Sequence, residues 1–248
     1  MLHARLLLSS FLILNSYLAR AAPAATATTD ARLTQVIREV SLLLAGAPAR
    51  HAILNETVGE TSAVKTGGDS RAELTFPDLT ISRLGANSLY SFKNAGRRGD
   101  LETGSTLLRV PKDSRGATIL SSAVTVGITG TTVIFEHIRG GASRLTVLEG
   151  TARLALVRAR DQQRSVSAGQ SLEVPPGAVR LPDPKPIDLA ALMKTSPLIN
   201  GFRPLPSQNL INNAIRQQQP QRSPLNQNQR PAPQGPQNNA TPPGPGPR

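Results

Sequence analysis

Short runs in which apolar and polar residues alternate fill the sequence from Thr57 to Val174. Alternation with a period of two places successive side chains on opposite faces of a β-strand. Glycine-rich turns, such as Gly67-Gly68-Asp69, separate the runs. Many short strands joined by tight turns predict an all-β fold. The apolar positions that we expect in its core are Leu74, Phe76, Val126, Val133, Phe135, Val147 and Leu154.

Residues 1–21 have the layout of a secretory signal peptide. Arg5 precedes an apolar run from Leu6 to Leu18, and Ala19-Arg20-Ala21 supplies the small residues of a cleavage point. The apolar run is too short to cross a hydrocarbon core roughly 30 Å thick. We therefore expect export, cleavage between Ala21 and Ala22, and no membrane span in the mature chain.

The segment before the β region allows two readings. Residues 22–39 form a lead-in of small and polar residues that becomes apolar toward its end. Apolar residues between Ala31 and Ala45 recur at helical spacing, which favours a short helix, while Val40–Leu44 fits a first strand equally well. Residues 40–175 follow as one β domain.

The segment after the β region is rich in proline. Residues 176–203 form an extended linker, in which Asp188 is placed to cap one short helix, Leu189–Lys194. Residues 204–248 are rich in proline, glutamine and asparagine, and hold arginines but no acidic residue. Because such a segment buries too little apolar surface to offset its ordering entropy, we predict a disordered basic tail, with a weak helical tendency over Asn209–Gln218.

Composition argues against several classes of function. The chain has a net charge of +12 but no tryptophan and only two tyrosines, so aromatic platforms for nucleic acids or sugars are scarce. It has no cysteine, and His51 and His137 are the only histidines after the leader. We therefore expect no enzyme activity, no metal and no cofactor. Arg97-Arg98, an isolated basic pair, is expected in a solvated loop, and Gly127–Thr132 lacks the lysine of a phosphate-binding loop.

Several motifs in the β region resemble the FecR domain family, in the correct order and over roughly residues 40–175. In the first half the matching positions are Thr66, Gly67, Asp69, Ser70, Arg71, Asp78 and Asn87. In the second half they are Gly130, Thr131, Glu149, Gly150 and Gly169. Most of these residue types favour turns, so we interpret them as structural turn and strand positions rather than as catalytic groups.

The resemblance implies a β-helix-like or solenoid-like fold of short strands in the periplasm. Regulators of this family sense a partner there and relay its state through a transmembrane helix to a sigma factor. This chain departs from the pattern at Leu79, where the family has glycine, at Thr129, where it has arginine, and in having no cytoplasmic or spanning helix.

Two functions fit these observations. The first is a non-catalytic exported interaction module of the cell envelope, without a transmembrane relay, whose partner is an unknown envelope protein. The alternative is a cell-surface or matrix polymer binder, in which the basic tail contacts an anionic surface polymer. Specific nucleic-acid binding is not expected.

Overall fold

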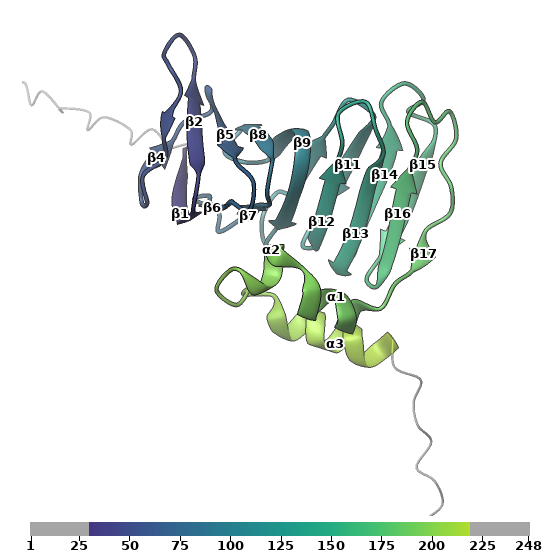
Figure 1. The fold of residues 1–248 in the computed structure, drawn as a ribbon. Coiled ribbons are helices and arrows are strands. Elements are labelled where there is room, and N and C mark those ends of the chain that lie inside the picture. Colours follow the sequence, from purple (N-terminus) through teal and green to yellow (C-terminus); the bar gives the residue numbers. More distant parts are fainter. Residues whose placement is uncertain (1–29, 219–248) are drawn as a thin grey trace, which may run out of the picture.

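The computed structural model describes residues 30–218, and these residues form strands and helices in the order that follows (Figure 1). The strands are β1 Ala31–Ile37, β2 Val40–Leu44, β3 Arg50–His51, β4 Thr57–Val58, β5 Ser62–Thr66, β6 Arg71–Thr75, β7 Ile81–Leu84, β8 Leu89–Lys93, β9 Arg98–Arg109, β10 Ala117–Leu120, β11 Val124–Ile128, β12 Thr132–His137, β13 Ser143–Glu149, β14 Thr151–Leu156, β15 Gln163–Ser167, β16 Gln170–Val174 and β17 Lys185–Pro186. The helices are α1 Leu189–Thr195, α2 Pro197–Asn200 and α3 Gln208–Gln218. The predicted all-β class is confirmed.

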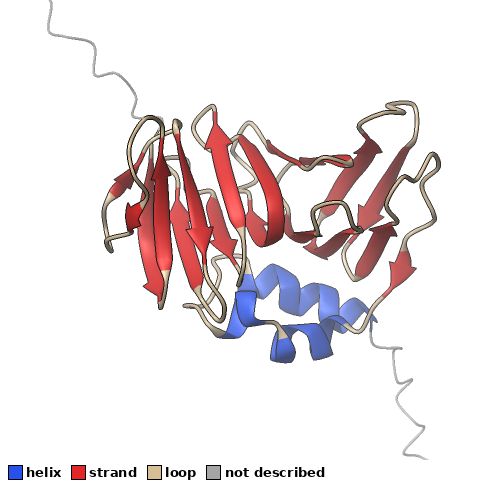
Figure 2. Cartoon of the chain, turned by 45° about the horizontal axis from the view of Figure 1, so that its top comes forward, coloured by secondary structure: helices blue, strands red, loops and turns tan. Residues whose placement is uncertain are grey.

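The strands pair into two sheets. Sheet A contains, in spatial order, β4, β1, β6, β7, β9, β12, β13, β16 and β17. Sheet B contains β3, β2, β5, β8, β9, β10, β11, β14 and β15. The chain passes between the sheets every one or two strands and advances from β1 and β2 at one end to β16 and β17 at the other (Figures 1 and 2).

Strand β9 belongs to both sheets. Its first half pairs with β8 in sheet B, and its second half pairs with β7 and β12 in sheet A. The change of sheet falls at Gly104, which has φ +99° and lies so close to Ser88 that a β-carbon would collide with it. Only glycine fits both conditions.

The main hydrophobic core lies between the two sheets. All seven side chains that we predicted there are buried, with exposed fractions of 1% or less: Leu74, Phe76, Val126, Val133, Phe135, Val147 and Leu154. Phe76 and Phe92 meet edge to face in this core, with ring centroids 4.9 Å apart. Period-two alternation therefore identified the correct face of each of these strands.

A second, smaller core lies on the outer face of sheet A. Leu107, Ile134 and Leu148 point outward from β9, β12 and β13 and pack against residues of the helices, including Leu198 and Ile211. We call residues 189–218 the C-terminal cover. The prediction that disorder begins at residue 204 is wrong for residues 204–218, because α3 forms there and buries its apolar side against sheet A.

The ends of the β region also differ in detail from expectation. Residues 31–37 form a strand, and the alternative of a helix from Ala31 to Ala45 is wrong. A bulge between Leu33 and Gln35 in the β1–β6 pairing shifts the register by one residue. Leu33 and Val36 consequently both face the core at a spacing of three, which resembles helical periodicity. The short linker helix is observed as Leu189–Thr195, with Asp188 accepting a hydrogen bond from the backbone nitrogen of Ala191 at 2.9 Å.

The signal peptide, its cleavage point between Ala21 and Ala22, and the tail beyond Gln218 lie outside the described residues. Within residues 30–218, none of the helices combines the length and apolar character needed to span a membrane.

Candidate interaction surface

The turn after β5 holds several of the motif positions of the first half. The Gly67 nitrogen donates to the backbone oxygen of Glu39 at 2.9 Å, and the Ser70 hydroxyl accepts from the Glu39 nitrogen at 3.1 Å. Asp69 has φ +52° and its exposed carboxylate lies 3.2 Å from Arg38. These contacts connect the turn to the β1–β2 turn and leave Asp69 facing solvent.

The buried Thr66 connects the same region to the turn that precedes β8. Its hydroxyl donates to the backbone oxygen of Gly85 at 2.6 Å and accepts from the Ser88 nitrogen at 2.9 Å. Asn87, within that turn, has φ +52°, a backbone conformation that asparagine tolerates better than most residues. The motif residues here hold turns together.

The second-half motif positions also occupy turns. Gly130, Gly150 and Gly169 have φ of +60°, +80° and +76°. The buried Thr131 hydroxyl donates to backbone oxygens, at 2.9 Å to Thr129 and at 3.1 Å to Thr151. The structure thus distributes these positions along the sandwich and does not gather them into one cluster.

Two motif residues face the C-terminal cover. Arg71 begins β6, and its side chain lies against Gly201 of the cover. Glu149 is buried, and its Oε1 accepts a hydrogen bond from the Thr132 hydroxyl at 2.9 Å, while that hydroxyl lies 2.8 Å from Ser207 in the cover. Burial raises the pKa of Glu149 above its ordinary value, against the opposing effect of the Thr132 hydrogen bond and nearby cations.

Arg83, which the sequence analysis did not single out, attaches the cover to sheet A. Its side chain is 1% exposed and pairs with Glu73 over 2.8 Å. Nη1 donates to the backbone oxygen of Leu198 at 3.2 Å, and Nη2 donates to that of Arg203 at 2.6 Å. The guanidinium also stacks on Phe202, 4.7 Å from the ring centroid. No local pattern identifies this role, because the cover residues lie more than a hundred positions further along the chain.

His137 lies inside the sandwich between two hydroxyls. Its Nδ1 lies 2.9 Å from the Ser143 hydroxyl and its Nε2 lies 3.1 Å from that of Ser122. Burial lowers the pKa of His137, which favours the neutral ring. A catalytic dyad needs a group that orients the imidazole, usually a carboxylate, and here serine occupies that position. The neighbouring Glu136 alternates to the other face of β12 and lies 3.6 Å from Arg144. The arrangement therefore connects β12 and β13 to the turn between β10 and β11.

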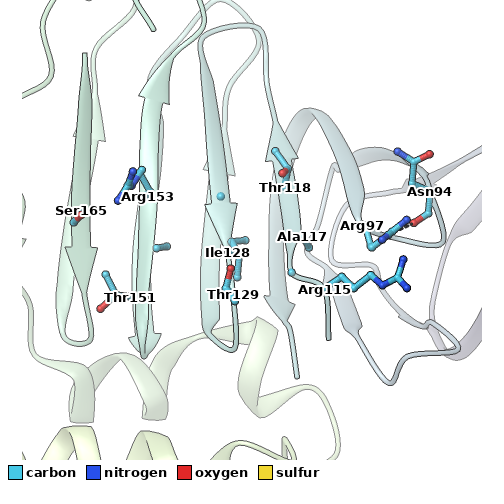
Figure 3. A pocket seen from close by; sticks show the side chains of 13 residues that line it. Asn94, Arg97, Arg115, Ala117, Thr118, Ile128, Thr129, Thr151, Arg153 and Ser165 are labelled. Atoms are coloured by element: carbon cyan, nitrogen blue, oxygen red, sulfur yellow. Dashed lines mark hydrogen bonds between the residues drawn. The ribbon is translucent and has the colours of Figure 1, made fainter. Parts of the chain in front are cut away.

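The outer face of sheet B carries a groove of about 640 Å³ over β10, β11, β14 and β15. Its floor consists of small residues, and Thr118, Gly127, Arg153 and Ser165 stand directly opposite one another on the four strands. Arg97 and Arg115 lie at the side next to β9, across the groove from Arg153 (Figure 3). The groove is open to solvent, whereas the cover buries Leu107, Ile134 and Leu148 on the outer face of sheet A.

Comparison with known proteins gives the family of this fold. Residues 62–153 match the family model described as FecR protein. This part of the chain is a FecR domain. FecR proteins are regulatory, envelope-associated proteins that interact with other proteins in signalling.

Two crystal structures of a "putative anti-sigma factor" from Parabacteroides distasonis ATCC 8503 also match. They share 13% and 12% sequence identity with this chain, each with a TM-score of 0.46 over 54% of it. The match spans 65% and 64% of those chains, which is less than two thirds of their length. No curated protein matches this chain.

The FecR domain keeps one motif turn despite the loss of its glycine. In Asp78-Leu79-Thr80, the Asp78 carboxylate accepts from the Thr80 nitrogen at 2.9 Å and from its hydroxyl at 3.0 Å. Leu79 takes the position of the family's glycine, has φ +64° and is 65% exposed. The second departure from the family pattern, Thr129, lines the groove on sheet B. Among residues 30–218, we find no group of acidic residues and histidines able to hold a metal ion.

Proposed function

We propose that this chain is an exported, non-catalytic interaction module of the cell envelope, and that its partner protein binds the outer face of sheet B. One observation carries the proposal: the two outer faces differ in access. The cover buries Leu107, Ile134 and Leu148 on sheet A, while sheet B presents exposed positions such as Gly127 and Arg153. The outer face of sheet B is therefore the surface that we assign to a partner needing a broad, rigid platform.

The fold suits a passive platform. The hairpins advance from one end of the molecule to the other, and we propose that the domain acts as a solenoid-like rigid scaffold resembling the periplasmic domain of FecR-type regulators. His137 and the hydroxyls beside it form a structural link, which supports a role in binding rather than in catalysis. We further propose that the chain binds its partner without a transmembrane relay of its own.

Export has a direct test. N-terminal sequencing of the protein recovered from the cell envelope or the medium should begin at Ala22, because Ala19 and Ala21 supply the small residues that precede the expected cleavage point. Recovery of the protein in the cytoplasm with Met1 still present would contradict this part of the proposal.

The partner face can be tested by site-specific photo-crosslinking in living cells. A photoreactive phenylalanine analogue is placed at Thr125 or Gln163, which lie in one row across sheet B next to the groove. The matched control is Asn209, an exposed position on α3. We expect both sheet B positions to form an adduct with the same protein and Asn209 to form none. Adducts from Asn209 alone, or no adduct from either sheet B position, would overturn the proposed face.

A further inference from the structure

The charge pattern of the groove on sheet B favours one kind of partner. This inference rests on the proposed interaction through that face. Thr118, Gly127, Arg153 and Ser165 are mutually opposed across four neighbouring strands. Strands in a sheet lie about 4.8 Å apart, so this row extends over about 14 Å. That length accommodates several residues of an extended chain.

Three exposed arginines of the groove lack a carboxylate partner. Arg97, Arg115 and Arg153 have no Asp or Glu oxygen within 4.0 Å among the described residues. Their neighbours differ in this respect, because Arg98 lies 3.5 Å from Asp100 and Arg164 lies 3.3 Å from Asp183. The residues that line the groove include no acid. The groove therefore keeps its positive charge uncompensated.

The floor between the arginines favours oxygen-rich ligands. Gly127 adds no side chain to the floor, and Thr118, Thr151 and Ser165 bring hydroxyl groups to the lining of the groove. Hydroxyls and guanidinium groups are donors for carboxylates, and arginine binds a carboxylate with two parallel hydrogen bonds. No aromatic side chain lines the groove, so it offers no platform for stacking a sugar ring.

Charge also excludes two nearby occupants. A second copy of this chain bound face to face through the groove would bring its own Arg97, Arg115 and Arg153 against the same positive charge. The segment from residue 219 onward contains Arg222, Arg230 and Arg248 and no acidic residue, so it is repelled as well. From the groove's charge, dimensions and floor we infer that it binds an extended acidic segment of the partner protein. Carboxylates of that segment pair with Arg153 on one side and with Arg97 and Arg115 on the other.

The test uses the mature full-length chain and a fluorescently labelled glutamate decapeptide, with a glutamine decapeptide as the uncharged control. The groove variant is R97Q/R115Q/R153Q. The matched variant is R158Q/R160Q/R180Q, which removes the same charge from exposed positions outside the arginine cluster. Each exposed pair contributes little by itself, and loss of all three together should weaken binding about tenfold. We expect this loss in the groove variant and a change below about threefold in the matched variant.

A charge-reversed variant makes the test independent of peptide choice. R97E/R115E/R153E should lose the glutamate decapeptide and gain binding of a lysine decapeptide, with an unchanged thermal transition. Equal losses in the groove and matched variants would show that only overall charge matters and would overturn the inference. Tighter binding of polygalacturonate than of the glutamate decapeptide would overturn it in favour of an anionic polysaccharide. If the crosslinks from Thr125 and Gln163 form but do not respond to R97E/R115E/R153E, the proposed function stands and the acidic partner segment is refuted.

Discussion

The Nη2 atom of Arg83 donates a hydrogen bond of 2.6 Å to the backbone oxygen of Arg203. This contact joins a buried strand of the FecR domain to a loop 120 residues later in the chain. Together with the Glu73 ion pair and the Leu198 carbonyl, it satisfies a charge that would otherwise be buried without partners. The cover is thus held both by apolar packing and by two hydrogen bonds from the Arg83 guanidinium.

Replacing Arg83 should destabilise the whole domain. Arg83→Met leaves Glu73 as a largely buried carboxylate without its cation, and removal of one member of such a pair costs about 3–5 kcal/mol. Urea denaturation measures the loss. The double variant E73L/R83M should recover part of it, because no buried charge then remains. A double variant as unstable as Arg83→Met would show that the unpaired carboxylate is not the cause.

Removing the cover should have a large effect on melting. A chain that ends at Asp188 exposes Leu107, Ile134 and Leu148, and each buried side chain of this size contributes about 1.5–3 kcal/mol. We expect the melting temperature to fall by many degrees or the domain to unfold. The control is a chain that ends at Gln218 and retains α3, which should melt close to the full-length chain.

The expected loss of stability on removing the cover differs from what the composition of residues 204–248 suggests. A disordered segment from Pro204 onward would be dispensable for stability, whereas α3 buries Ile211 and Ala214 on sheet A. Equal melting temperatures for the chains ending at Asp188 and Gln218 would show that the cover contributes nothing.

Restoring glycine at Leu79 should stabilise the protein. Leu79 has φ +64°, a conformation that costs a non-glycine residue about 1 kcal/mol, and its exposed side chain contributes little packing. Leu79→Gly should raise the free energy of unfolding by about 0.5–1 kcal/mol. Leu79→Ala keeps the β-carbon and should bring no such gain. If alanine stabilises as much as glycine, removal of exposed apolar surface is the cause rather than backbone strain.

Glu149 should make stability depend on pH in an unusual direction. Because burial raises its pKa in the folded state, the carboxyl stabilises the fold while it is protonated, and this contribution is lost as pH rises through the folded pKa. Glu149→Gln can still accept the Thr132 hydrogen bond but does not titrate. The variant should therefore gain stability relative to the parent protein as pH rises from 4 to 7, which urea midpoints across that range can measure. A difference that stays constant would contradict the raised pKa.

His137 should have the opposite effect in the acid range. Burial lowers its pKa, so the neutral ring contributes stability above the ordinary value of 6.5 that is lost as pH falls through the lowered pKa. An NMR titration should place the ring's transition below pH 6.5. Substitution by glutamine should remove this part of the acid destabilisation. A His137 ring that titrates above 6.5 would show that a partner stabilises its charged form.

Sequence predicted the strands and their buried faces well where one physical signal dominates. Strands such as β11 and β14 bury alternate residues, so Val126 and Leu154 could be placed in the core from periodicity alone. The bulge in β1 breaks this rule locally, and the spacing of Leu33 and Val36 then imitates a helix. The FecR motifs could be recognised in the sequence alone, because their glycines and threonines occupy turns whose geometry favours these residue types.

The contacts of the cover could not be predicted in the same way. Helix α3 presents Ile211, Ala214 and Ile215 at helical spacing, but glutamine and asparagine surround them and mask the signal. Arg83 and Glu149 look like ordinary strand positions until the helices are placed over them. The groove depends on arginines from separate parts of the chain, since Arg97, Arg115 and Arg153 line one groove only once β9, β10, β11 and β14 are assembled in sheet B.

The crossing of β9 at Gly104 has a mechanical consequence. Because one continuous backbone belongs to both sheets, a force that slides sheet A past sheet B loads covalent bonds as well as side-chain contacts. Shear between the layers is resisted near the middle of the molecule, while the strands toward each end are held to the opposite sheet only by packing and turns. A force applied to the face of sheet B should therefore move the two sheets and the helices behind sheet A together, with little sliding of one sheet over the other.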